Sequence, residues 1–178
     1  MDFSEINFAV LVATLIVAST PLVLAALGEL IVEKSGVLNL GVEGMMIIGA
    51  VTGFIVGVET GSAYIGMMAA AMAGALLSLL FAFIILIMQA NQVASGLALT
   101  IFGLGIAALM GHPYTGIKSP QISTISIPFI SEIPVLGTMF FQHDLIVYLS
   151  LISVLVIWYF LNRMKAGLIL RSVGEDHD

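Results

Sequence analysis

The side chains that could carry chemistry gather in one short stretch, residues 28–44, with the sequence GELIVEKSGVLNLGVEG. Its ionisable and amide side chains are Glu29, Glu33, Lys34, Asn39 and Glu43. Such groups at a membrane boundary could gate or line a path for a polar solute, or could form a boundary loop in which a glutamate lies near Lys34. We expect irregular backbone here, which membrane proteins tolerate where protein buries it or where it lines a watery cavity.

The rest of the chain lacks the residue patterns of an enzyme. Its three histidines, His112, His143 and His177, are scattered singly, and we expect them to be solvated loop or tail residues. There is no His-Glu-x-x-His pair, no Gly-x-Ser-x-Gly elbow, no phosphate-binding P-loop and no cysteine. We therefore expect no catalytic residue, no metal site and no cofactor.

The composition is that of a membrane protein with several spans. Of the 178 residues, 60% are hydrophobic and only 9% are charged, whereas soluble domains carry roughly a quarter charged residues. No formally charged side chain occurs between Glu59 and Lys118, and a span needs only about 20 mostly apolar residues. The net charge of −6 argues against binding nucleic acid.

Five apolar segments emerge when charges, prolines and glycine clusters are taken as boundaries. They cover residues 6–27, 44–58, 63–88, 92–110 and 145–161. The prediction is an all-α protein with about five transmembrane helices, in which residues 1–178 form a single transmembrane domain. The third and fourth segments should form an antiparallel hairpin, because only the uncharged turn 89–91 separates them.

The second segment is short for a membrane span. As an α-helix, residues 44–58 would rise only about 22 Å, short of a hydrocarbon core of about 30 Å. It crosses the membrane only if residues 38–42 are helical too, so a short re-entrant or broken helix is the alternative. Gly49, Gly53 and Gly57 are spaced by four and should allow a close helix contact.

The charges of the tail set the orientation. Arg163, Lys165 and Arg171, three of the five basic residues, follow the last apolar segment. The excess of basic residues in cytoplasmic segments therefore places the tail in the cytoplasm and the long loop 111–144 outside. Within that loop, residues 122–130 are predicted to be amphipathic or re-entrant. The N-terminus lies outside if the second segment spans and inside if it is re-entrant.

Five sequence motifs, in this order, resemble the permease subunits of ABC importers. They are GELIVEKSGVLNLGVEGMM, ANQVASGLALTIFGLGIAAL, GHPYTGI, IPVLG and GLILRSVGEDHD. The likeness is greatest to the nucleoside and simple-sugar permeases of the branched-chain amino acid and ribose permease superfamily. It implies a plasma-membrane complex of two permeases, identical or different, with two cytoplasmic ATPases and an extracellular solute-binding protein.

In this family a cytoplasmic helix transmits the motion of the ATPase to the permease, and the GLxLRxVGE segment leads into it. The matching positions are Gly167, Leu168, Leu170, Arg171, Val173, Gly174 and Glu175. From its residues alone, the same basic and apolar segment could simply anchor the last helix at the lipid headgroups. The resemblance favours coupling.

The substrate pathway would need uncharged hydrogen-bonding groups for a nucleoside or sugar. The candidates are Asn91, Gln92, Ser95 and Thr100, and then Asn39 and Glu43. Hydrogen bonds between helices are the alternative role of these side chains.

The alternatives to an ATP-driven importer are an ion-coupled carrier and a structural membrane subunit. Family members extend beyond the tail, so we expect an N-terminal fragment or one part of a split permease.

Overall fold

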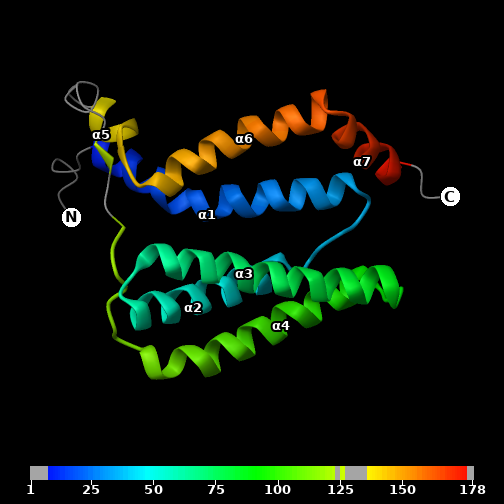
Figure 1. Ribbon diagram of the computed structural model, residues 1–178, viewed down its shortest axis with the longest axis horizontal. Helices are drawn as coiled ribbons and strands as arrows, with labels where there is room; N and C mark the ends of the chain where they lie inside the picture. Colours follow the sequence, from blue (N-terminus) through cyan, green and yellow to red (C-terminus); the bar gives the residue numbers. More distant parts are fainter. Residues whose placement is uncertain (1–7, 123–124, 127–135, 176–178) are drawn as a thin grey trace. The chain divides into compact units, whose positions relative to one another are not determined.

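The computed structural model describes residues 8–122, 125–126 and 136–175 (Figure 1). It is helical, as predicted. The long helices are α1 (Phe8–Lys34), α2 (Val42–Thr60), α3 (Ala63–Ala82), α4 (Gln92–Gly111) and α6 (Leu145–Arg163). A π-helical turn, η2 (Phe83–Ile87), extends α3, and a 3₁₀ turn, η3 (His112–Tyr114), extends α4. Five of the described helices are long and apolar enough to cross a membrane.

The contacts divide the chain into two compact units. One is Val32–Ile122, which holds α2, α3 and α4. The other combines most of α1 with the described residues from 125 to 175.

The polar stretch 28–44 is helical at both ends, so the prediction of irregular backbone is right only for residues 35–41. Glu and Lys favour helices nearly as well as Leu does, so their charge does not end α1. Gly36 ends it, with a φ of 85°. The N–H of Val37 donates to the carbonyl of Val32, and that of Gly36 to Glu33, which is the Schellman motif.

The second helix, α2, is longer than the predicted segment 44–58, but not through residues 38–41. Residues 38–41 are not helical, and α2 instead runs from Val42 to Thr60, about 28 Å for its 19 residues. It ends at Gly61, whose φ is 67°. The stripe of small residues does allow the predicted close helix contact. A Cβ atom built on Gly53 would lie 2.9 Å from the carbonyl oxygen of Gly66 on α3.

On another face, α2 packs against α4 with the two backbones in contact. A Cβ atom on Gly44 would lie 2.6 Å from the carbonyl oxygen of Leu99. One on Gly103 would lie 2.8 Å from the Cα atom of Gly44. The predicted turn after α3 is present, and the chain reverses there, so that α3 and α4 run in opposite directions (Figure 1). Most of their packing is nevertheless with α2 rather than with each other, so they are not a simple hairpin.

In the other unit, α6 is followed directly by the short helix α7 (Lys165–Glu175). The break between them is at Met164, which has an extended conformation. Before α6 lie a short helix, α5 (Leu136–Phe140), and the strand β2 (Gln142–His143), which pairs antiparallel with β1 (Ile125–Ser126). The amphipathic or re-entrant piece predicted at 122–130 lies mostly outside the described residues.

Candidate functional site

The helix α2 begins level with the middle of its two neighbours. Gly44, in its first turn, packs against Gly103, which is the central residue of the candidate span Gln92–Tyr114. The carbonyl oxygen of Met45 lies 3.7 Å from the Cβ position of Gly74, one residue from the centre of the span Ala63–Ile87. The half of α4 that begins at Gln92 is therefore matched by the non-helical residues 35–41, and we call this segment together with α2 the broken second crossing.

Side chains of α4 hold this non-helical chain in place. The Oε1 atom of Gln92 accepts a 2.8 Å hydrogen bond from the backbone N–H of Leu38. The hydroxyl of Thr100 donates a 3.0 Å bond to the carbonyl oxygen of Leu40. Between them, Gly96 lets the chain lie on the helix backbone, since a Cβ atom there would be 2.9 Å from the nitrogen of Gly41. We name Leu38, Asn39, Leu40 and Gly41 the entry segment.

The side chain of Asn39 stabilises the entry segment through hydrogen bonds to Gly41 and Met45. Its side chain is buried, with 7% of its surface exposed. The Oδ1 atom accepts a 3.0 Å bond from the N–H of Gly41, and the Nδ2 atom donates to the sulfur of Met45 at 3.8 Å. The amide thus supplies the turn that leads into α2, because the side chain replaces a backbone partner for Gly41.

The structure brings three of the six candidate pathway residues together on the entry segment: Asn39, Gln92 and Thr100. The other three lie nearby with different surroundings. Asn91 is exposed and caps α4, since its Oδ1 atom accepts a 3.0 Å bond from the N–H of Ala94. Ser95 is half-buried, and Glu43 is exposed in the first turn of α2. The bonds of Gln92 and Thr100 go to backbone atoms of the entry segment, which is close to the alternative role of hydrogen bonds between helices, although the entry segment is not helical.

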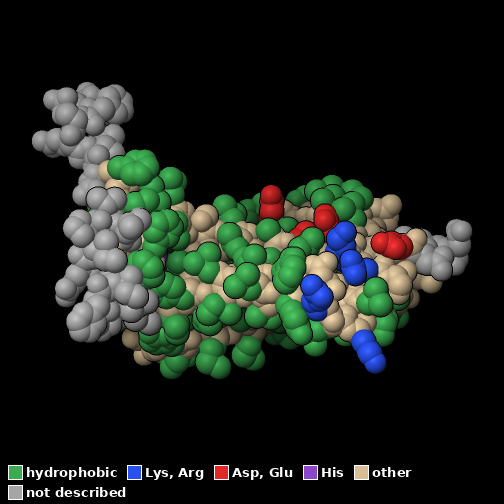
Figure 2. All heavy atoms as spheres, turned by 90° about the horizontal axis from the view of Figure 1, so that it is seen from above, with side chains coloured by type: hydrophobic (Ala, Val, Ile, Leu, Met, Phe, Trp, Pro, Cys, Tyr) green, Lys and Arg blue, Asp and Glu red, His purple; other side chains and the backbone are tan. Residues whose placement is uncertain are grey.

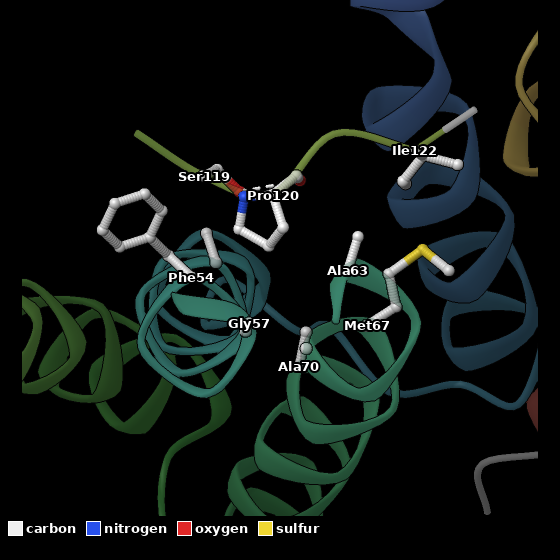
Figure 3. Close-up of a pocket in the computed structure, with 11 residues that line it drawn as sticks. Phe54, Gly57, Ala63, Met67, Ala70, Ser119, Pro120 and Ile122 are labelled. Carbon is white, nitrogen blue, oxygen red and sulfur yellow. Dashed lines mark hydrogen bonds between the residues drawn. The ribbon is translucent and has the colours of Figure 1, made fainter. Parts of the chain in front are cut away.

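A cavity of about 340 Å³ lies between α2 and α3, towards the ends of these helices that meet at Gly61 (Figure 3). Phe54 and Gly57 line it from α2, Met67 from α3, and Ser119 and Pro120 from the segment that follows η3. Its size is at the lower end of the range for small-molecule sites. Sequence reasoning missed these residues, because a lone aromatic or methionine in an apolar helix carries no distinguishing signal.

One further polar contact joins α2 and η3. The hydroxyl of Tyr114 donates a 2.7 Å hydrogen bond to the Oε1 atom of Glu59. Both residues lie at the same end of the unit as the cavity, since Glu59 is in the last turn of α2. This bond fixes the spacing of α2 and α4 at the end opposite the entry segment.

His143 corrects the prediction that the histidines are solvated. Only 3% of its surface is exposed. Its Nε2 atom is 2.8 Å from the carbonyl oxygen of Met139, so it must carry the proton, and its ring packs edge-on against Tyr148. The pairing of β2 with β1 holds it in this position. His112 is exposed, as expected, whereas His177 lies outside the described residues.

The predicted coupling residues all lie on α7. Gly167 is buried, and a Cβ atom there would collide with the carbonyl oxygen of Phe160 in α6. Leu168 and Val173 are exposed, while Arg171 and Gly174 are half-buried. Leu170 is also half-buried, and Glu175 is exposed. The helix therefore turns back tightly on α6 while presenting apolar side chains outward. Figure 2 shows hydrophobic side chains over much of the visible surface.

Comparison with known proteins finds a family and several relatives for this chain. The family described as "Branched-chain amino acid transport system / permease component" matches residues 11–178. A protein of Haloferax volcanii with a provisional name as a glucose ABC transporter permease is 39% identical, over 89% of this chain and 50% of its own length. The guanosine ABC transporter permease protein NupQ of Bacillus subtilis is 38% identical, over 98% of this chain and 58% of its own.

A nucleoside ABC transporter permease protein of Lactococcus lactis subsp. cremoris is 32% identical, over 94% of this chain and 56% of its own length. The chain thus spans about half the length of the curated relatives it matches. No solved structure matches it. The family and the five apolar helices identify a multi-pass membrane protein. The resemblance found in the sequence is confirmed: this chain belongs to the permease component family of the branched-chain amino acid transport system.

Proposed function

We propose that the complete protein is the membrane-spanning permease subunit of an ATP-driven ABC importer for nucleosides, related ribosides or simple sugars. The observation that carries this proposal is the broken second crossing, in which polar backbone reaches the middle of two apolar spans. Discontinuous helices of this kind form the substrate sites of many transporters. The guanosine, nucleoside and glucose names of the relatives support the substrate class.

In this proposal the chain supplies the pathway and not the energy. ATP is bound and hydrolysed by a separate cytoplasmic ATPase, so the permease itself uses no cofactor. An extracellular solute-binding protein delivers the substrate, and a second permease, identical or different, completes the pathway. The protein would lie in the plasma membrane with its C-terminal tail in the cytoplasm, as the basic residues of the tail favour.

The six candidate pathway residues divide into two groups within this proposal. Asn39, Gln92 and Thr100 would shape the wall, because their side chains already hold the entry segment. Asn91 would support the wall by capping α4. Glu43 and Ser95 would face the solute, since neither side chain makes a hydrogen bond within the part of the chain that the structure describes.

We further propose that α7 couples the permease to its ATPase. The support is the amphipathic character of α7 and its tight packing on α6 at Gly167. Because α7 packs directly on α6, a displacement of α7 would move α6 as well. A helix joined by a flexible linker would instead move without α6. The outward-facing Leu168 and Val173 would supply apolar contacts to the ATPase.

Reconstitution of the complete permease with its ATPase and binding protein tests the function. Vesicles should take up labelled guanosine, adenosine, uridine or glucose only when ATP is supplied on the ATPase side. Uptake driven by a proton or sodium gradient without ATP would instead identify an ion-coupled carrier. Copurification of a stable complex that moves none of these solutes would identify a structural subunit and refute the proposal.

A further inference from the structure

Glu43 is a carboxylate that lies level with the middle of two candidate spans. The residues that follow it, Gly44 and Met45, pack against the middle of the α4 and α3 spans. Glu43 is one residue from Gly44, so it lies within about 2 Å of that level along the helix axis. In a bilayer centred on the α3 and α4 spans, this is the depth where a charge is most costly.

The carboxylate faces neither of the two neighbouring helices. Gly44 points to α4, and the stripe of Gly49 and Gly53 points to α3. Glu43 is exposed, and its side chain makes no hydrogen bond with the described residues. A carboxyl group at this depth points to a water-filled surface rather than to lipid.

The cavity lies on the same face of α2. Residues 43, 50, 54 and 57 are spaced by seven, four and three, so they share one side of an α-helix. Ala50, Phe54 and Gly57 line the cavity. Glu43 lies about 10 Å further towards the entry segment than Ala50, because seven helical residues rise by that distance. One continuous face thus carries an apolar cavity at its outer part and a carboxylate at its inner end.

We propose that Glu43 is the hydrogen-bond acceptor for hydroxyl groups of the transported solute at the midpoint of the pathway. This inference rests on the proposed function and assigns a specificity residue within it. A carboxylate has two acceptor oxygens, which match the two neighbouring hydroxyls of a ribose or a sugar ring. The apolar cavity with Phe54 suits the base or the ring face before the solute reaches Glu43.

Site-specific labelling tests the aqueous surface without requiring transport. Residues 1–178 contain no cysteine, and any cysteine elsewhere in the complete permease is replaced by serine, so that Glu43→Cys is the single thiol of this subunit. We expect a charged, membrane-impermeant thiosulfonate to modify it, and guanosine to slow the reaction. The control is Ile101→Cys, at the same depth on α4 but 71% exposed on an apolar face, which should not react. If Glu43→Cys reacted with the reagent as little as Ile101→Cys does, the inference would be overturned.

Uptake by the reconstituted transporter tests the hydroxyl contact. We compare guanosine with 2′,3′-dideoxyguanosine in wild type and in Glu43→Ala, using the same binding protein throughout. The preference for guanosine should fall by about tenfold or more, the expected effect of losing a hydrogen bond to a charged group. Glu43→Gln, which keeps one acceptor oxygen, should lose less. An unchanged preference in Glu43→Ala would refute the contact.

The two proposals fail in different ways. If the wild-type transporter moves no riboside or sugar, the proposed function fails, while a reactive Glu43→Cys still supports a water-facing carboxylate. If ATP-driven uptake occurs but Glu43→Cys is inert and Glu43→Ala keeps its preference, only the role of Glu43 is refuted. Should Glu43→Ala fail to assemble, the labelling of Glu43→Cys decides the matter.

Discussion

The hydroxyl of Thr100 on α4 donates a 3.0 Å hydrogen bond to the backbone carbonyl oxygen of Leu40, a residue 60 positions earlier in the chain. The bond satisfies an acceptor that has no helical partner, because the entry segment is not helical. Together with Gln92, it fixes the place at which α2 begins. The stability of the broken crossing therefore depends on side chains of another helix.

Replacing Thr100 with Val should destabilise the protein by about 0.6–1.7 kcal/mol, the range of hydrogen bonds between membrane helices. The shape of the side chain is kept and only the donor is lost. Thr100→Ser, which keeps the hydroxyl, is the control and should lose less. Unfolding in mixed micelles, followed by the fluorescence of Trp158, the one tryptophan of residues 1–178, measures the difference. Equal stability of the Val and Ser variants would contradict the role of the bond.

Gly44→Ala should separate α2 from α4 and cost about 1–3 kcal/mol, as overpacking of a tight contact does. The added methyl group would meet backbone atoms of Leu99 and Thr100, which cannot rotate away. Gly105→Ala is the matched control on α4, because no atom lies within 4 Å of its Cβ position. That variant should be neutral or gain up to about 1 kcal/mol from helix propensity. Thermal unfolding in detergent compares the two, and similar midpoints would refute the contact.

Asn91→Ala separates a structural role from a pathway role. The variant should lose about 1 kcal/mol of stability, because the cap of α4 is removed. Asn91→Asp keeps the acceptor oxygen and should retain most of the stability. Below the unfolding temperature, neither variant should change the KM for uptake. A rise in KM for both variants, at wild-type stability, would show instead that Asn91 contacts the solute.

Gly167→Ala should uncouple ATP hydrolysis from uptake while leaving membrane insertion intact. The methyl group would collide with the carbonyl of Phe160 and force α7 away from α6. Gly28→Ala is the control, since its Cβ position has no atom within 4 Å. We expect ATP-driven uptake to fall at least several-fold in Gly167→Ala and to be unchanged in Gly28→Ala. Parallel assays of ATPase activity and uptake in proteoliposomes would disprove coupling if both variants behaved as wild type.

The helices were predictable because long apolar runs leave few alternatives in a membrane. The predicted segments 63–88 and 145–161 nearly coincide with the spans Ala63–Ile87 and Leu145–Arg163. The end of α1 was placed too early, at residue 27, because Glu29 and Glu33 were taken as a boundary. Charged residues continue a helix readily, and the local signal that ends it is Gly36 with its positive φ.

The depth of α2 could not be predicted, because it depends on contacts distant in the sequence. Composition places apolar residues in the membrane, but the level at which α2 starts is set by Gly44 against Gly103. Similarly, Asn39, Gln92 and Thr100 were selected for their polarity, while their bonding partners depend on how α4 packs. His143 was misjudged for the same reason, since its partner Met139 lies on α5, a helix with no strong sequence signal.

The entry segment also has a consequence for the order of biosynthesis. The side chains of Gln92 and Thr100 bind backbone groups of Leu38 and Leu40, and they lie 54 and 60 residues further along the chain than these groups. During synthesis, therefore, the second crossing reaches the membrane before the helix that completes it exists. Until α4 has been made and inserted, the unpaired groups of Leu38 and Leu40 must remain in contact with water or with the insertion machinery. This portion of the protein must therefore mature after translation has passed residue 100, however early its own residues were made.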